Sequence, residues 1–294
     1  MSTLSFSSYH PGINFFYFAG AIICTVFFSH PLFVATSALM TILYYLLTKK
    51  KEGLRFLGGS TILAVMIALL NPVFNTQGST VLFTYFGGRP YTKEALLYGC
   101  ITAAMFISVI LLFSCYNEIM TSDKFIYLFG NHIPSISIVL TMALRFVPLF
   151  KKHAGNVLNA RLCMGRNNSN ARDKIKNGMD TLSGLTSWAL EGAVTTGDSM
   201  KNRGYGYARR TGFALYRIDG RDKAAFCTLG ISCILIIFAV VSGAMRVEYI
   251  PDFEFAGFNI FTAIGLAGYL MFFGLPSFLQ IQEEVKWNSL LSKI

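Results

Sequence analysis

The chain contains six stretches of 15 to 23 residues that are almost entirely apolar and have no charged residue in their central part. They cover residues 13–28, 31–47, 56–70, 95–116, 224–245 and 257–279. A helix needs about 20 apolar residues to cross the hydrocarbon core of a bilayer, and somewhat shorter helices also occur. Because lipid offers no hydrogen-bond partner to the backbone, such segments cross as helices. We therefore predict an all-α membrane protein with about six transmembrane helices.

The composition supports a membrane protein and argues against two other classes. Only 14% of the residues are charged, whereas soluble domains carry roughly 25%, so a soluble globular enzyme does not fit. The 27 Phe and 14 Tyr residues supply more apolar surface than a disordered chain leaves in water.

Basic residues predict the orientation in the membrane. The loop between the second and third stretches carries three lysines at 49–51 and Arg55, which places it in the cytoplasm under the positive-inside rule. Alternation along the chain then puts both termini in the cytoplasm. Of the 25 Lys and Arg residues, only Arg89, Lys93 and Arg246 fall on the outer side. The predicted topology is therefore consistent with the charge distribution.

The segment 117–223 holds most of the excess positive charge. It has 16 Lys and Arg against 8 Asp and Glu, which is +8 of the total +10. We interpret it as a cytoplasmic helical domain inserted between the fourth and fifth transmembrane helices. The chain then divides into a membrane part of four helices (1–116), this domain (117–223) and a membrane part of two helices (224–294).

Three helices are predicted inside this domain. Residues 121–129 are typical of a short amphipathic element, and residues 135–150 predict a helix at the membrane surface that closes in Pro148 and Lys151-Lys152. Residues 171–200 form the clearest helix, since Ile175, Met179, Leu182, Leu185, Ala189 and Ala193 recur at three- and four-residue steps. We expect the small residues of this helix to let another helix cross closely. Gly204 and Gly206 follow Arg203 and predict a left-handed helix terminus.

No catalytic or metal-binding motif is found in the sequence. The pattern G-x-x-x-x-G-K-[ST] of nucleotide-binding loops is absent, and so is H-E-x-x-H. The four histidines are scattered, and the six cysteines form no C-x-x-C pair, which favours buried free thiols. No charge inside the apolar stretches could carry protons or ions across. We therefore predict a non-catalytic protein without a metal or cofactor.

Several strings resemble one family. The run Met200–Gly206 (MKNRGYG), followed by Arg209-Arg210-Thr211-Gly212, resembles the second arginine motif of the T component of energy-coupling factor transporters, a cobalt-transporter Q-like family. These are vitamin and metal-ion importers of the ABC class. The other matching strings are His10-Pro11, Asn71–Asn75 with Gly78, Leu82-Phe83, Thr92–Ala95 with Tyr98-Gly99, and Leu144–Pro148. The resemblance runs from about His10 to Arg221.

The resemblance implies a role and two kinds of protein partner. In this family two cytosolic ABC ATPases bind ATP, a small membrane S component binds the substrate, and the T component joins them within the plasma membrane of bacteria or archaea. Arginines at the ends of its coupling helices dock in grooves of the ATPases. A guanidinium suits this role because it is always charged and presents a planar fork of donors to a carboxylate.

The resemblance also implies the docking residues. Asn202, Arg203 and Gly204 match the second motif, with Asn in place of the usual Ala. In residues 159–166 the first motif is not contiguous, so that Arg161 and Arg166, the latter next to Gly165, are rival anchors. The resemblance also implies that specificity for the transported substrate lies in the S component.

Two other functions stay open from the residues alone. The chain could be a self-contained small-solute permease or a membrane enzyme, but either would need polar groups lining a path through the apolar stretches. It could also be a membrane-tethered lipid or nucleic-acid binder that uses its basic face. The absence of aromatic residues interleaved with the basic ones between Arg161 and Lys201 argues against nucleic acid, and the bilayer is the expected lipid partner.

Overall fold

The computed structural model describes residues 5–75, 78, 80–85, 89–130, 134–165, 170–207, 216–243, 245, 247–248, 254–255 and 259–291. The chain divides into two compact units. The first, which we call the membrane unit, combines Met1–Lys124 with Tyr216–Ile294, and the second, the inserted unit, is Phe125–Leu215. The inserted unit begins eight residues later and ends eight residues earlier than the predicted domain 117–223. Its side of the membrane stays a prediction.

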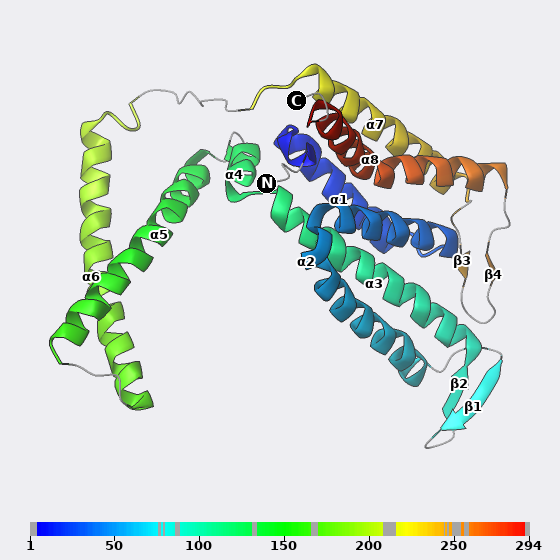
Figure 1. The fold of residues 1–294 in the computed structure, drawn as a ribbon, viewed down its shortest axis with the longest axis horizontal. Helices are drawn as coiled ribbons and strands as arrows, with labels where there is room; N and C mark the ends of the chain where they lie inside the picture. Colours follow the sequence, from blue (N-terminus) through cyan, green and yellow to red (C-terminus); the bar gives the residue numbers. More distant parts are fainter. Residues whose placement is uncertain are drawn as a thin grey trace. The chain divides into compact units, whose positions relative to one another are not determined.

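The membrane unit is a bundle of helices (Figure 1). It contains the short 3-10 helix η1 (Ser5–Ser8) and the helices α1 (Pro11–Phe27), α2 (Pro31–Phe74), α3 (Lys93–Ile119), α7 (Gly220–Val241) and α8 (Ile260–Leu291). Two short antiparallel hairpins, which the sequence did not predict, join pairs of these helices. They are β1 (Val81–Tyr85) with β2 (Arg89–Thr92), and β3 (Val247–Glu248) with β4 (Glu254–Phe255).

The apolar stretches are helical, which confirms an all-α membrane protein at the level of fold class. Five segments among the described residues are long and apolar enough to cross a membrane: Pro31–Lys49, Gly53–Phe74, Lys93–Ile119, Gly220–Val241 and Ile260–Trp287. The helix α1 is also apolar but has only 17 residues. The count of six transmembrane helices therefore stays a prediction for α1.

The predicted loop between the second and third stretches is instead a sharp bend within α2. The backbone stays helical from Pro31 to Phe74. A Cβ atom built on Gly53 would lie only 2.7 Å from the Cβ of Lys49, whereas Cβ atoms four residues apart in a straight helix are about 5–6 Å apart. The helix is thus strongly bent at this point, and the bend needs a residue without a Cβ at Gly53.

Aromatic side chains form the core of the membrane unit. Tyr17 of α1 stacks on Phe272 of α8 with ring centroids 5.5 Å apart, and Phe33 of α2 meets Tyr269 edge-on at 5.3 Å. All four are at most 1% exposed. Apolar side chains also cover the outside of the helices, as with Ile62, which is 74% exposed. Helices that are apolar on every side are typical of a protein surrounded by lipid.

The inserted unit consists mainly of two long helices. The short helix α4 (Ser122–Gly130) leads from the membrane unit into it, and α5 (Pro134–Cys163) and α6 (Ala171–Asn202) follow. The predicted helices 121–129 and 171–200 are confirmed. The prediction that the middle helix closes in Pro148 and Lys151-Lys152 is wrong, because α5 continues through them to Cys163. Proline removes one backbone hydrogen bond, but its fixed φ is compatible with a helix, so flanking residues can carry the helix through.

Candidate functional site

The helices α5 and α6 cross each other within the inserted unit (Figure 1). At one contact the imidazole of His153 stacks on the indole of Trp188, with ring centroids 4.3 Å apart and planes inclined by 12°. Phe150 meets the same indole edge-on at 5.5 Å. Offset and edge-on pairs of this kind contribute about 0.5–1.5 kcal/mol beyond the area they bury. The aromatic contact therefore fixes one point of the crossing.

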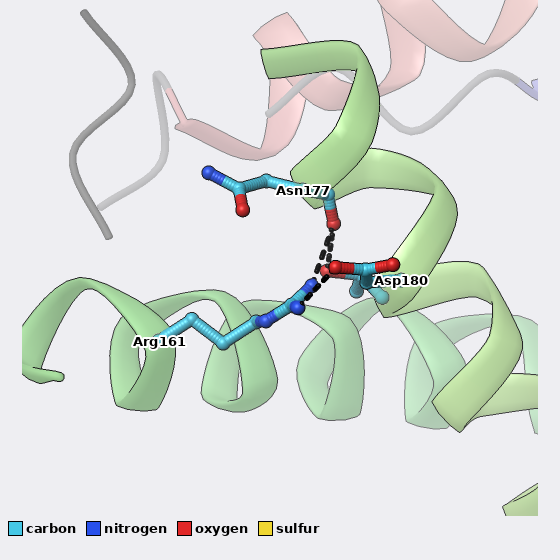
Figure 2. Close-up of polar contacts among 4 residues, drawn as sticks. Arg161, Asn177 and Asp180 are labelled. Carbon is cyan, nitrogen blue, oxygen red and sulfur yellow. Dashed lines mark hydrogen bonds and ion pairs between the residues drawn. The ribbon is translucent and has the colours of Figure 1, made fainter. Parts of the chain in front are cut away.

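A polar contact fixes a second point, which Figure 2 shows. Arg161 of α5 donates to the carboxylate of Asp180 at 2.5 Å and to the main-chain carbonyl of Asn177 at 3.0 Å, both on α6. Arg161 lies eight residues after His153, and Asp180 lies eight residues before Trp188, which is a step of about 12 Å along each helix. The order is reversed between the helices, so they pack antiparallel.

The end of α6 has the geometry that the sequence predicts. The backbone N–H of Gly204 donates to the carbonyl of Lys201 at 2.9 Å, and that of Tyr205 donates to Met200 at 3.0 Å. This pair of bonds is the Schellman motif, which needs a left-handed residue after the helix cap. Gly204 has φ +77°, as predicted. Arg203 is the cap residue itself and its side chain is exposed.

The end of α5 has a similar glycine but a different cap residue. Gly165 has φ +81°, and its N–H donates to the carbonyl of Leu162 at 3.1 Å. Met164 therefore occupies the position that Arg203 occupies on α6. Arg161 lies one turn earlier and points to α6, with its side chain 16% exposed. Arg166 lies outside the described residues, as do Arg209 to Gly212.

The two glycine-capped ends lie far apart. Ala171, the first residue of α6, lies only six positions after Gly165 in the sequence, and α6 has 32 residues. At 1.5 Å per residue α6 is about 48 Å long. The turn at Gly204 is therefore separated from the turn at Gly165 by a distance on the order of that length. One helix pair thus presents two helix ends at two separate places.

The predicted apolar face of α6 is mostly not covered by the described residues. Ile175, Met179 and Leu182 are each about two-thirds exposed. A Cβ atom built on any of the four glycines of the helix would meet no atom within 4 Å; these are Gly178, Gly184, Gly192 and Gly197. The helix that these small residues were predicted to accommodate is therefore not α5. The sequence also carried no signal for the pairing of Arg161 with Asp180, since the two residues are 19 positions apart.

Neither a metal centre nor a known relative defines this site. Within the described ranges, no group of three or more His, Cys, Asp or Glu side chains is placed to hold a metal ion. No family model matches the chain, and no curated protein matches it in sequence. What the sequence and structure define together is the class: an all-α membrane protein with a crossed pair of long helices inserted between its membrane segments.

Proposed function

We propose that the chain is the T component of an energy-coupling factor transporter in a bacterial or archaeal plasma membrane, with both termini in the cytoplasm. In this role it is a non-catalytic scaffold. It carries the movement of two ABC ATPases to a substrate-binding S component and so drives the uptake of a micronutrient such as a vitamin or a metal ion.

The observation that carries the proposal is the exposed Arg203 at the capped end of α6. Its backbone is held in the Schellman turn, so the guanidinium starts from a fixed point. A guanidinium at such a position can capture a carboxylate of a partner through two parallel hydrogen bonds. In the proposal Arg203, with Asn202 and Gly204 beside it, docks in a groove of one ATPase.

The first docking arginine is better assigned to Arg166 than to Arg161. Arg161 already donates to Asp180 and to the Asn177 carbonyl within the inserted unit. A guanidinium used in this way would have to give up both contacts before it could bind a partner. Arg166 directly follows the glycine turn at Gly165. In the proposal Arg161 positions α5 against α6, and Arg166 docks.

The exposed face of α6 supports a further partner that contributes a helix. Apolar side chains exposed along a helix, together with glycines that have free space beside them, allow close packing by a helix of another chain. In the proposal this helix belongs to the S component. The separation of the two glycine-capped ends supports two ATPases, one at each end.

Charge reversal at Arg203 tests the proposal. We expect Arg203→Glu to release at least one ATPase from the purified complex and to abolish ATP-driven uptake. Arg203→Lys should keep the charge but lose the two-pronged contact, and should give an intermediate result. The matched control is Lys201→Glu, which makes the same charge change two residues away on an exposed side chain. If Arg203→Glu retains both ATPases and full uptake, the docking assignment is wrong.

A second experiment separates the proposal from a self-contained permease. The purified chain is reconstituted into liposomes by itself and then with two ATPases and an S component. We expect substrate to move only in the second case, and only with ATP. Substrate movement by the chain alone would contradict the proposal and favour the permease.

A further inference from the structure

The chain leaves the membrane unit after Lys124 and returns to it at Tyr216. We call the region around Lys124 the exit point and the region from Tyr216 to Asp222 the return point. At each of them a buried charged side chain is hydrogen-bonded to the same short N-terminal segment, Ser5–His10, which precedes α1. Because the two points are far apart in sequence, only the tertiary structure brings them to one segment.

Lys124 holds the exit point. Its ammonium donates to the carbonyl of Ser7 at 2.6 Å, to the Ser7 hydroxyl at 3.0 Å and to the carbonyl of Ile119 at 2.9 Å. All three donors of the lysine are thus used. Lys124 is only 5% exposed, and this burial lowers its pKa. The side chain therefore joins the end of α3, the start of α4 and the N-terminal segment.

Asp222 holds the return point. It lies in the first turn of α7 and is 6% exposed. One carboxylate oxygen accepts from the backbone N–H of His10 at 3.2 Å, and the other accepts from the N–H of Asp219 at 3.1 Å. The second bond is half of a capping box that starts α7. The start of α7 is therefore tied to the residue that caps α1.

The N-terminal segment is itself fixed in the core. Phe6 is fully buried and meets Tyr17 edge-on with ring centroids 5.3 Å apart. Tyr9 is also buried, at 8% exposed. Ser7 and His10 are three residues apart, a reach of at most about 11 Å of chain. The exit and return points are thus held by one short, well-packed piece of chain.

We infer that the segment Ser5–His10 links the exit and return points mechanically, so that the inserted unit is attached at two points that move together. Its role in transport rests on the proposed function: when the ATPases close, both attachments would carry the movement as one. The alternative is two independent caps, each of which stabilises only its own helix. The two readings differ in whether loosening one point also loosens the other.

Amide hydrogen exchange on the purified full chain in detergent micelles distinguishes these two readings without any partner. Lys124→Met removes the ammonium at the exit point. We expect exchange to accelerate there and also, by about tenfold or more, at the backbone amides of His10 and Asp219, since hydrogen bonds to charged groups are stronger than neutral ones and their loss favours local opening. Conversely, Asp222→Ala should accelerate exchange in α4. Changes confined to the mutated point would overturn the inference.

The control and a milder variant guard against general unfolding. Lys223→Met makes the same charge change at the start of α7 on an exposed side chain, and we expect it to leave exchange at the exit point unchanged. If Lys124→Met does not fold, Ser7→Ala removes only the hydroxyl acceptor. It should accelerate exchange at the same amides, by a smaller factor. Unchanged exchange at His10 and Asp219 in Ser7→Ala would also overturn the inference.

A transport measurement then tests the role of the linkage. In the complex with the ATPases and the S component, Lys124→Met should keep both ATPases bound and ATP hydrolysis intact but move at least several-fold less substrate per ATP. An unchanged ratio would overturn this role. If the wild-type chain binds no ATPase, the proposed function fails while the exchange result still decides the linkage. If ATPases bind and the exchange changes stay local, the linkage fails and the proposed function stands.

Discussion

The guanidinium of Arg161 lies 2.5 Å from the carboxylate of Asp180, and this ion pair joins α5 to α6 (Figure 2). The Arg161 side chain is 16% exposed and that of Asp180 is 40% exposed. Arg161 also donates to the carbonyl of Asn177. The arginine therefore stabilises the crossing through one partly screened ion pair and one further hydrogen bond.

Removing either partner of this ion pair should loosen the helix crossing. We expect Asp180→Ala to lower the free energy of unfolding of the inserted unit by about 1 kcal/mol, the upper end for a partly exposed pair. Arg161→Ala should cost about 2 kcal/mol, because it also leaves the Asn177 carbonyl without this donor. The double variant should cost less than the sum. Denaturant unfolding followed by Trp188 fluorescence in a Trp287→Phe background measures this, and strict additivity would contradict the pairing.

The stacking of His153 on Trp188 should be visible in the same fluorescence. We expect His153→Ala to expose one face of the indole, to shift its emission to longer wavelength and to cost about 0.5–1.5 kcal/mol. His153→Phe keeps a flat ring at this position and should retain the wild-type emission. Identical spectra for the Ala and Phe variants would show that the imidazole does not cover the indole in solution.

Two glycines, one inside α6 and one just after its end, should respond in opposite directions to the same substitution. Gly204→Ala places a side chain at φ +77°, a conformation that costs an L-residue about 1–2 kcal/mol. Gly197→Ala lies inside the helix with free space around the new Cβ and should stabilise it by up to about 1 kcal/mol. Thermal unfolding compares the two variants. If both variants are less stable than the wild type, the positive φ of Gly204 does not explain the lower stability of Gly204→Ala.

A glycine of α3 that packs against α2 should not tolerate even a methyl group. A Cβ atom on Gly99 would lie 2.7 Å from the carbonyl oxygen of Ala68, and a backbone atom cannot move aside easily. We expect Gly99→Ala to cost about 1–3 kcal/mol, the usual range for overpacking. The control is Gly59→Ala in α2, where a Cβ would meet nothing within 4 Å. Unfolding of the detergent-solubilised chain by SDS measures both, and equal stability of the two variants would argue against this close approach.

The parts of the fold that were predicted correctly depend on neighbours in sequence. Apolar stretches long enough to cross a bilayer are helical, and the helix predicted over 171–200 is found as α6. The left-handed turn at Gly204 was predicted from a glycine that follows a helical pattern. Each of these features arises from the preferences and periodicity of adjacent residues, so one sequence is enough to predict it.

The wrong predictions arise where the rest of the structure overrides a local sequence preference, or where one sequence pattern is compatible with several conformations. Pro148 ends many helices, yet flanking residues continue α5 through it. The lysines at 49–51 were predicted to lie in a loop, but this part of α2 stays helical and bends at Gly53. A short basic stretch is compatible with a helix and with a loop, and the packing of the surrounding helices selects one of the two conformations.

The sequence by itself determined the class of this protein, the extent of α6 and the position of Arg203 at its end, because these follow from local composition and periodicity. The tertiary structure alone decided which charged residues meet. Arg161 pairs with a residue 19 positions away, Lys124 with one 117 away and Asp222 with one 212 away. Such pairs depend on how the helices pack. Packing depends on shape and burial across the whole unit, which the separation of two residues in the sequence does not reveal.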